Sequence, residues 1–341
     1  MADDLYHWNI NGLKCKRSPN YSGKINQISS ILESTSTSIL NIQETHIDNE
    51  NELPHFLCTY SHLFAFEKTF ASSGDVFSGI LVCIRKTEKV IATEILENGR
   101  LIYIKIMNKA SNSYKHFFSI YCNPSGPSKK KNLITKLRDK ISLNHIHIES
   151  CIIMGDFNFV TSILDRNSQS MNRTDLETVK EWGPFEDNFN FQDTFRLTNP
   201  TQRLYSLTLK ANQKIKARID RVYCTSDLCG KTLSTCFIPT LLSDHKIVKV
   251  KMAINIDKGR GLWVFNNSYL KEETYCTKIK EICETTTFED ANFEDRRSFW
   301  DFKKQVFINF SKNYALGRAK ASKKEYYEHK NGFDKLETIH Q

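Results

Sequence analysis

The sequence has no hydrophobic run long enough to cross a bilayer and no apolar leader at its amino end. The longest apolar runs, such as residues 79–84, fall far short of the ~20 residues that a membrane-spanning helix needs. The first residues, Met1-Ala2-Asp3-Asp4-Leu5-Tyr6, are acidic and lack the apolar region of a secretory signal. We therefore expect a soluble, intracellular protein with no membrane partner.

Cysteine pairs with the spacing of a zinc module are also missing. The ten cysteines are scattered, and the closest of them form no Cys-x-x-Cys pair: Cys224, Cys229, Cys236, Cys276 and Cys283. We expect core thiols in a reducing compartment. The sequence also shows no internal repeat and no long low-complexity tract.

The sequence does contain enough apolar material for a core, and it carries an excess of positive charge. At 341 residues, 40% hydrophobic and 11% aromatic, the chain can form one large domain with an appendage, or two domains. The formal net charge of +9 favours a polyanionic partner, nucleic acid or acidic lipid, although many basic proteins are merely soluble. By residue count, the excess lies mainly in residues 1–254.

The stretch Cys151-Ile152-Ile153-Met154-Gly155-Asp156-Phe157-Asn158 predicts a buried strand that ends in a polar site. Gly155 is expected to let the chain turn, so that Asp156 and Asn158 stand at the strand end. A solvated turn would explain this stretch equally well. Three other polar clusters at predicted strand ends favour the site: Asn9 with Asn11, residues 43–46 and residues 243–245.

The first part of the chain predicts a strand, a helix and a second strand. Residues 5–11 alternate, with Tyr6, Trp8 and Ile10 on one face and His7, Asn9 and Asn11 on the other. Residues 22–34 have helical spacing and residues 39–42 form a short buried strand. A right-handed crossover between the strands would bring Glu44 close to Asn9.

The middle of the chain predicts antiparallel strands. Four strand-like runs follow one another without helices, at residues 77–85, 89–97, 101–107 and 116–121, which favours hairpins. A helix marked by Leu133, Leu137 and Ile141 comes next. Lys129, Lys130 and Lys131 lie at its exposed start, as a solvated face or as a grip on phosphates.

The rest of the first domain predicts a short helix at residues 175–182, a break at Pro184, and strands at 204–209, 217–223 and 246–252. Together these patterns predict an α/β fold of two sheets with helices outside, over residues 1–254. Residues 255–341 are expected to form a linker, including residues 258–261, followed by two or three amphipathic helices. Their apolar faces would carry Leu270, Ile279, Ile282, Phe299, Phe302, Val306 and Phe310.

The polar clusters suit phosphodiester hydrolysis. Mg²⁺ needs only one or two carboxylates at a phosphate-accepting site, and Glu44 and Asp244 would suit it. Asp156, Asn158 and His245 have the chemistry to orient a water and stabilise a phosphate. Taken singly, each residue could instead be a cap, a surface acid or a turn former. A serine hydrolase built on Ser-Asp-His is disfavoured, because adjacent residues of a strand point to alternate faces.

The motifs resemble those of the endonuclease/exonuclease/phosphatase superfamily, most of all the apurinic-like endonuclease domain of non-LTR (LINE-type) retrotransposon polyproteins. The resemblance covers residues 5–253 and is carried by Asn9-Ile10-Asn11-Gly12-Leu13, Gln43-Glu44-Thr45-His46, Ile120-Tyr121, Gly155-Asp156-Phe157-Asn158, Leu164-Asp165-Arg166, Arg218-Ile219-Asp220-Arg221 and Ser243-Asp244-His245. Residues 261–270 resemble the segment that leads from this endonuclease to a reverse transcriptase. No polymerase sequence follows them, so we expect the chain to be a fragment, a truncated copy or an incomplete gene model.

The resemblance implies a four-layered α/β sandwich and Mg²⁺-dependent nicking of double-stranded DNA, with Mn²⁺ as a possible substitute. The nick would leave a 3′-hydroxyl that primes reverse transcription in the nucleus, by a reverse transcriptase domain of the same polyprotein.

The resemblance also implies residue roles. Glu44 would be the principal metal ligand, with Asn11 and Asp244 close to the ion. Asp156 would activate the water, Asn158 and Asn9 would position the water and the phosphate, Asp220 would orient His245, and Tyr121 would contact the phosphate or the leaving group. The implied DNA contacts are Arg166, Ser206, Lys210, Lys214, Lys216 and Ser243.

Two positions depart from related patterns. Asn11 stands where DNA-repair members carry an aspartate, which argues against a dedicated abasic-site repair enzyme. Ser206 stands where retrotransposon members usually carry threonine, and it keeps a hydroxyl for a phosphate. The alternatives are an abasic-site repair nuclease, more distantly an inositol-lipid phosphatase or a sphingomyelinase, and a catalytically decayed nucleic-acid-binding relic.

Overall fold

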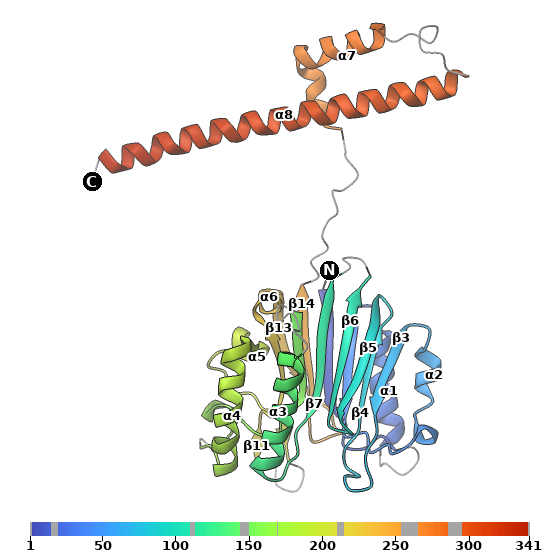
Figure 1. Cartoon of the computed structure of the whole chain (residues 1–341), viewed down its shortest axis with the longest axis vertical. Helices are drawn as coiled ribbons and strands as arrows, with labels where there is room; N and C mark the ends of the chain where they lie inside the picture. Colours follow the sequence, from blue (N-terminus) through green and yellow to red (C-terminus); the bar gives the residue numbers. More distant parts are fainter. Residues whose placement is uncertain are drawn as a thin grey trace. The chain divides into compact units, whose positions relative to one another are not determined.

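The computed structural model describes residues 2–14, 20–109, 113–143, 150–168, 170–209, 215–253, 265–285 and 295–339 (Figure 1). The chain divides into two compact units, residues 1–257 and residues 258–341. Within the described ranges, no helix combines the length and the apolar character needed to span a membrane.

The first unit contains both strands and helices. In chain order its elements are β1 (Ala2–Asn9), α1 (Tyr21–Glu33), β2 (Thr37–Gln43), α2 (Phe56–Tyr60), β3 (Phe64–Thr69), β4 (Ile80–Arg85), β5 (Glu88–Glu97), β6 (Leu101–Asn108), β7 (Tyr114–Tyr121), α3 (Pro127–Leu143), β8 (Cys151–Asp156), α4 (Arg173–Phe189), β9 (Phe191–Asp193), α5 (Thr194–Thr198), β10 (Leu207–Thr208), β11 (Lys216–Ala217), β12 (Asp220–Thr225), α6 (Ser226–Cys229), β13 (Thr232–Ile238) and β14 (Ile247–Ala253). Among the described residues, strands β3 to β7 follow one another without a helix between them.

Two six-stranded sheets form the centre of this unit. Their strand orders are β13-β14-β1-β2-β4-β3 and β5-β6-β7-β8-β12-β9, and β10 pairs with β11 in a separate short hairpin. Strands β1 and β2 run parallel, as the predicted crossover requires, and so do β7 and β8. Figure 1 shows α1 and α2 on one side of the stacked sheets and α3 and α4 on the other. The predicted four-layered α/β sandwich is therefore confirmed.

Alternating side chains build the layers. On β1, Leu5 belongs to the core between the two sheets, while Tyr6 and Trp8 belong to the core beneath α1 and α2. A third core, which includes Phe157 and Trp182, lies between the second sheet and helices α3 and α4. Burial on both faces explains why the central strands are nearly continuous apolar runs.

The predicted hairpin between residues 77–85 and 89–97 is wrong, because the chain changes sheets there. Strand β4 pairs with β2 and β3 in the first sheet, whereas β5 pairs with β6 in the second. Strand β4 is apolar on both faces: Val82 packs between the sheets and Leu81 packs toward α1 and α2. It therefore fits a central position, and the mostly exposed β5 fits an edge. Strand β3 was not predicted.

The predicted break at Pro184 is also wrong. Helix α4 continues through Pro184 to Phe189. Proline in a helix interior costs about 3 kcal/mol, but Trp182 and Phe185 on either side of it are fully buried against the second sheet. Their packing offsets the cost. The predicted strand at 204–209 shortens to the two residues of β10.

The lysines at the start of α3 have three different environments. Lys129 is exposed, Lys130 is buried, and Lys131 forms an ion pair with Glu181 of α4 at 2.6 Å. The expectation of an exposed start is thus wrong for Lys130, and burial lowers the pKa of its ammonium group.

The cysteines are only partly core thiols. Among the described ones, Cys83, Cys122, Cys151 and Cys224 are buried, while Cys58, Cys236 and Cys283 are exposed.

The second unit contains α7 (Glu273–Thr285) and α8 (Arg296–Ile339). The ring of Tyr275 stacks on Phe310, and its hydroxyl lies 2.7 Å from Ser311 Oγ. Lys303 donates to the last carbonyls of α7, those of Ile282 and Cys283. Of the predicted apolar positions, Leu270 and Phe302 are exposed rather than packed. The proposed linker, residues 258–261, lies outside the described residues.

Candidate active site

The predicted polar clusters meet at one end of the sandwich because of strand direction. The parallel strands β1 and β2 end there, carrying Asn9 and the turn with Glu44, and the antiparallel β14 starts there after His245. In the second sheet, β8 ends at Asp156 and the antiparallel β12 starts at Asp220, directly opposite it in the ladder. The two sheets thus deliver their polar residues to one place.

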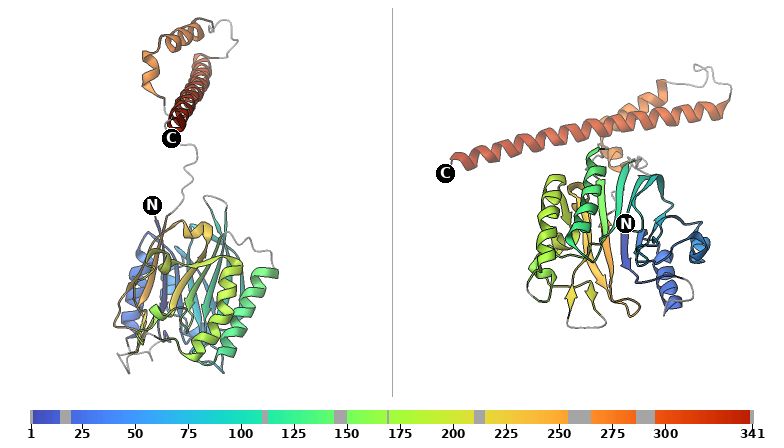
Figure 2. Two further views of the ribbon diagram at one scale, coloured as in Figure 1. Left: turned by 90° about the vertical axis from the view of Figure 1, so that its left-hand side faces the viewer. Right: turned by 60° about the horizontal axis from the view of Figure 1, so that its bottom comes forward.

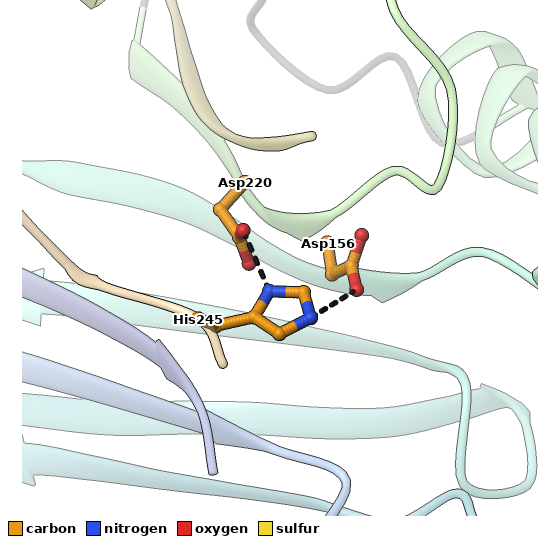
Figure 3. A group of neighbouring side chains, drawn as sticks. All are labelled: Asp156, Asp220 and His245. Carbon is orange, nitrogen blue, oxygen red and sulfur yellow. Dashed lines mark hydrogen bonds and ion pairs between the residues drawn. The ribbon is translucent and has the colours of Figure 1, made fainter. Parts of the chain in front are cut away.

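A buried chain of carboxylates and imidazoles forms the centre of this site, and Figure 3 shows three of its members, Asp156, His245 and Asp220. His245 Nδ1 donates to Asp220 Oδ2 at 2.8 Å, and the other oxygen of Asp220 lies 3.0 Å from Nε2 of His7. The remaining ring nitrogen of His245, Nε2, faces Asp156 Oδ2 at 4.0 Å. Asp220 and His7 are inaccessible, whereas His245 is 7% exposed. The imidazole of His245 therefore turns one nitrogen inward and presents the other at the surface end of the site.

Charge pairing sets the protonation of this chain. Burial opposes a charge on His245, but the carboxylate of Asp220 outweighs it and raises the pKa of His245 to about 10. Burial and the nearby charge of Asp220 raise the pKa of Asp156 to about 7, and the histidines hold the pKa of Asp220 well below its usual range despite burial. His245 is therefore an imidazolium at neutral pH, held in place by an ionised Asp220.

A single amide joins the two halves of the site. Nδ2 of Asn9 donates both to Glu44 Oε1 at 2.8 Å and to Asp156 Oδ2 at 2.9 Å. Beyond it, the Asn11 amide donates to Asp244 Oδ1 at 3.3 Å. Burial raises the pKa of the Glu44 carboxyl, but the nearby imidazole of His46, whose Nε2 lies 3.7 Å away, and the hydrogen bond from Asn9 more than compensate and lower it overall. Glu44 is thus ionised.

The backbone at this site is unusual. Four residues other than glycine adopt left-handed φ angles: Asn11 (50°), Glu44 (52°), His46 (58°) and Asn158 (51°). Asparagine tolerates this region, but for glutamate and histidine this conformation is unfavourable by about 1–2 kcal/mol each. Such outliers cluster at functional sites, because the surrounding structure must hold the side chains in a required direction.

Gly155 has a different role from the predicted one. It lies inside β8, and a Cβ there would come within 1.8 Å of the Ile120 carbonyl oxygen on β7. Because glycine has no side chain, the backbones of β7 and β8 can approach closely here, and so can the side chain of Gln43. The Oε1 atom of Gln43 accepts a hydrogen bond from the Asp156 N–H at 2.9 Å. The turn itself is made by Asn158, which donates through its backbone N–H to Asp156 Oδ1 at 2.9 Å.

Tyr121, Ser243 and Ser206 also lie at the site. Tyr121 is buried near Glu44 and Asp156, and burial together with these two carboxyl groups raises the pKa of its hydroxyl. Ser243 donates to the Asn9 carbonyl at 2.9 Å. Ser206 is completely buried, and its hydroxyl accepts the backbone N–H groups of Ile219 and Asp220, each at 3.1 Å. Ser206 therefore positions Asp220, and its hydroxyl is occupied rather than open to a phosphate.

The remaining predicted DNA contacts lie nearby or outside the described residues. Nε of Arg166 donates to Asp175 Oδ2 at 2.7 Å, and Lys216 is exposed on the β10–β11 hairpin, which stands at one end of the sandwich (Figure 2, right). That hairpin adjoins the site, because Thr208 N donates to the Asp244 carbonyl at 3.0 Å. Lys210 and Lys214 lie outside the described residues.

Comparison with known proteins agrees with this geometry. The model of the Endonuclease/Exonuclease/phosphatase family matches residues 6–245. The chain belongs to this family. A transposon protein of Xenopus laevis, "Transposon TX1 uncharacterized 149 kDa protein", is 25% identical over 285 residues, which are 82% of this chain and 21% of that protein. The chain thus spans about a fifth of the length of this relative.

Solved structures of the endonuclease/exonuclease/phosphatase fold agree. The AP endonuclease LMAP of Leishmania major matches with a TM-score of 0.58 and 17% identity, over 74% of this chain and 88% of that chain. The endonuclease domain of TRAS1, a telomere-specific non-LTR retrotransposon, matches with a TM-score of 0.53 and 13% identity, over 74% and 99%. With the transposon relative, these matches confirm the resemblance inferred from the motifs.

The residues present fit the divalent metal that this family implies. Among the described residues, Asp156, Asp220 and His245 each offer a ligand atom within 4.8 Å of the others. However, His245 is protonated and already bonded to Asp220, so the trio is better explained as a hydrogen-bonded chain. Glu44 is ionised and partly exposed, so it is better suited to hold the metal. Asn11 and Asp244 offer further oxygen ligands of the kind that Mg²⁺ prefers.

Sequence reasoning missed the residues that support this family's site from within. His7 bonds Asp220, and the Asn41 amide lies 3.3 Å from the other ring nitrogen of His7. Ser119 donates to Asn41 Oδ1 at 2.7 Å and accepts from the Gln43 amide at 2.9 Å. A signal existed for His7, because it shares the polar face of β1 with Asn9. The pairing of Ser119 with Gln43 crosses between the sheets and has no local signal.

Proposed function

We propose that the chain is a Mg²⁺-dependent endonuclease that nicks double-stranded DNA by phosphodiester hydrolysis and leaves a 3′-hydroxyl. The observation that carries the proposal is the 4.0 Å gap between Asp156 Oδ2 and His245 Nε2. The gap is too long for a direct hydrogen bond, and an oxygen between the two atoms would lie within reach of both. A carboxylate acceptor and an imidazolium donor facing one gap suit a water attacking a phosphate.

The roles follow from the contacts. Asp156 takes the proton of the attacking water, and Asn9 and Asn158, which bond the same carboxylate, hold it in place. His245, kept charged by Asp220, donates to a phosphate oxygen and stabilises the charge that develops on it. The oxygen of the water bonds to phosphorus as the bond from phosphorus to the 3′-oxygen breaks, and the 3′-oxygen takes a proton from solvent to become the 3′-hydroxyl. Tyr121 contacts this leaving oxygen or the phosphate.

The metal would be held by Glu44, with Asn11 and Asp244 nearby. When bound, it would neutralise phosphate charge and polarise the phosphorus–oxygen bonds. Asn9 positions Glu44 through its 2.8 Å bond and so couples the metal side of the site to the water side.

The biological setting is part of the same proposal. The likeness to a transposon protein and to a retrotransposon endonuclease domain supports a role in target-primed reverse transcription, in the nucleus. The reverse transcriptase would belong to the same polyprotein, with residues 255–341 as the segment that leads to it. The net charge of +9 supports DNA as the partner.

The test is nicking of supercoiled plasmid with Mg²⁺. Asp156→Ala and His245→Ala should each lower the nicking rate at least about a hundredfold with DNA affinity nearly unchanged, because each removes a group that acts in the transition state. Extension of the nick by a DNA polymerase would establish the 3′-hydroxyl. Nicking at the wild-type rate by either variant would refute the assigned roles.

Oligonucleotide substrates separate this proposal from abasic-site repair. Cleavage of intact duplexes is expected, and nick-site sequencing should show random or sequence-biased positions. Cleavage confined to abasic duplexes would favour the repair alternative, and failure of the wild-type chain to cleave any duplex would favour a decayed, DNA-binding relic.

A further inference from the structure

A buried lysine of helix α1 contacts the segment that carries Asn11. Lys24 lies in the first turn of α1 and is only 3% exposed. Its Nζ donates to the carbonyl oxygens of Asn11 at 2.9 Å and of Gly12 at 2.8 Å. Lysine is almost never buried unless its charge is satisfied. A buried lysine beside a proposed metal ligand therefore needs an explanation.

The turn that Lys24 binds is joined to the turn that carries Glu44. Asn11 and Gly12 have φ angles of 50° and 92°, so two consecutive residues are left-handed. Their carbonyls accept from Lys24, while Gly12 N donates to the Glu44 carbonyl at 2.7 Å. Lys24 thus holds one side of a backbone turn whose other side is hydrogen-bonded to the segment of the principal metal ligand.

The start of α1 also contacts the segment that carries Asp244. Gly23 precedes Lys24, and a Cβ at residue 23 would come within 2.9 Å of Leu242 Cδ2. Leu242 lies two residues before Asp244, whose Oδ1 accepts from the Asn11 amide at 3.3 Å. Helix α1 therefore contacts both segments that supply this pair of side chains.

We propose that Lys24 is a positioning residue for the divalent metal: it fixes the turn of Asn11, and with it the oxygen ligands that Asn11 and Asp244 offer to the ion. This inference rests on the proposed function and adds the residue that holds these ligands in place. An ammonium group only donates hydrogen bonds, so Lys24 acts through the backbone rather than as a ligand. Partners of metal ligands typically contribute about 10–100-fold to metal affinity.

Removal of the Lys24 ammonium has two opposite effects on metal affinity. It removes the donor that the carbonyls of Asn11 and Gly12 share, so the turn must rearrange, and this weakens metal binding. It also removes a positive charge that repels a cation, and this strengthens metal binding. The direction of the measured change therefore separates positioning from simple repulsion.

The test measures Mn²⁺ binding to the full chain without DNA, by electron paramagnetic resonance of the free ion. Lys24→Met should raise the Kd for Mn²⁺ at least about tenfold. Lys24→Arg should stay within about threefold of wild type, because a guanidinium also donates to two oxygens at once. If Lys24→Met does not fold, Lys24→Gln is measured in its place. A several-fold rise in Kd is then expected, because the amide is uncharged and reaches less far.

Arg85→Met is the matched control, because Arg85 bonds backbone carbonyls at the other end of α1. Its Nη2 donates to the Leu32 carbonyl at 3.1 Å, and its Nε donates to the Thr37 carbonyl. This variant also removes a cation that satisfies carbonyls, so its Tm should fall as that of Lys24→Met does. Its Kd for Mn²⁺ should equal that of the wild type.

Nicking gives the second readout. Lys24→Met should raise the Mg²⁺ concentration needed for half-maximal nicking, with the single-turnover rate at saturating Mg²⁺ nearly unchanged. An unchanged Kd for Mn²⁺ with a lowered Tm would assign Lys24 a purely structural role, and tighter Mn²⁺ binding would show that its charge repels the ion. Either result overturns the proposal and leaves the proposed function standing. If the wild-type chain does not nick duplex DNA and Glu44→Ala leaves Mn²⁺ binding unchanged, the proposed function fails, and the positioning role with it.

Discussion

Asp165 should be the most costly single charge to remove from this protein. Its side chain is fully buried, and it accepts from Arg218 Nε at 2.7 Å and Nη2 at 3.0 Å, and also from Arg196. Its carbonyl accepts the Arg218 N–H at 2.8 Å. Because Arg218 is two residues before Asp220, this pair anchors the start of β12 where it enters the active site.

The substitution Asp165→Asn keeps the shape and removes the charge. It leaves the fully buried Arg218 with one carboxylate partner, Asp193 at 2.7 Å. Breaking a buried ion pair costs about 3–5 kcal/mol, because the remaining charge is left uncompensated. At roughly 2–4 °C per kcal/mol for a unit of this size, Tm should fall by about 10 °C.

The effect should depend on pH in a defined direction. Burial opposes ionisation of Asp165, but the charge of Arg218 outweighs it and lowers the pKa of the carboxyl below its ordinary value. A carboxyl with a depressed pKa contributes stability that is fully present above its unfolded pKa of about 3.9 and is lost as the pH falls toward the folded pKa. The Tm difference between wild type and variant should therefore be constant from pH 5 to 7 and narrow below pH 4.

Calorimetry or thermal circular dichroism measures this difference. The control is Asp48→Asn, the same substitution at a surface ion pair with Lys14, where Asp48 is 46% exposed and no measurable change is expected. Equal Tm values for the two variants, or a difference that widens in acid, would refute the argument.

Three further outcomes are expected. Glu44→Ala should raise the Mg²⁺ concentration needed for half-maximal nicking, since it removes the carboxylate placed directly on the ion; an unchanged titration midpoint would assign the metal elsewhere. Gly155→Ala should yield little folded protein, measured by circular dichroism, because its Cβ would meet the Ile120 oxygen at 1.8 Å; a wild-type spectrum and Tm would contradict this. Replacing Lys210, Lys214 and Lys216 with alanine should weaken DNA binding and reduce its salt dependence, while single-turnover nicking at saturating DNA is largely kept. An unchanged salt dependence would exclude these lysines as phosphate contacts.

Local patterns in the sequence were sufficient for most of the elements. The alternation along β1, the helical spacing before β2 and the apolar run of β8 predicted those elements to within a few residues, because each pattern reflects which face is buried. The same patterns predicted that polar residues follow strand ends. They gave a wrong prediction where contacts with residues distant in sequence determine the local structure. At Pro184, the packing of α4 on the second sheet outweighs the tendency of proline to end a helix.

By itself, the sequence determined the two-sheet α/β class, the excess of positive charge and the residues Asn9, Glu44, Asp156 and His245 as candidates for one site. Only the tertiary structure showed that β4 and β5 belong to different sheets and that His7 bonds Asp220. It also showed that Ser206 accepts a backbone N–H group and that Gly155 allows a close approach of two strands. The reason is physical. The alternation of buried and exposed residues can be seen within a few neighbouring residues of the sequence. A hydrogen bond between residues 213 positions apart, such as His7 and Asp220, forms only when the two sheets stack.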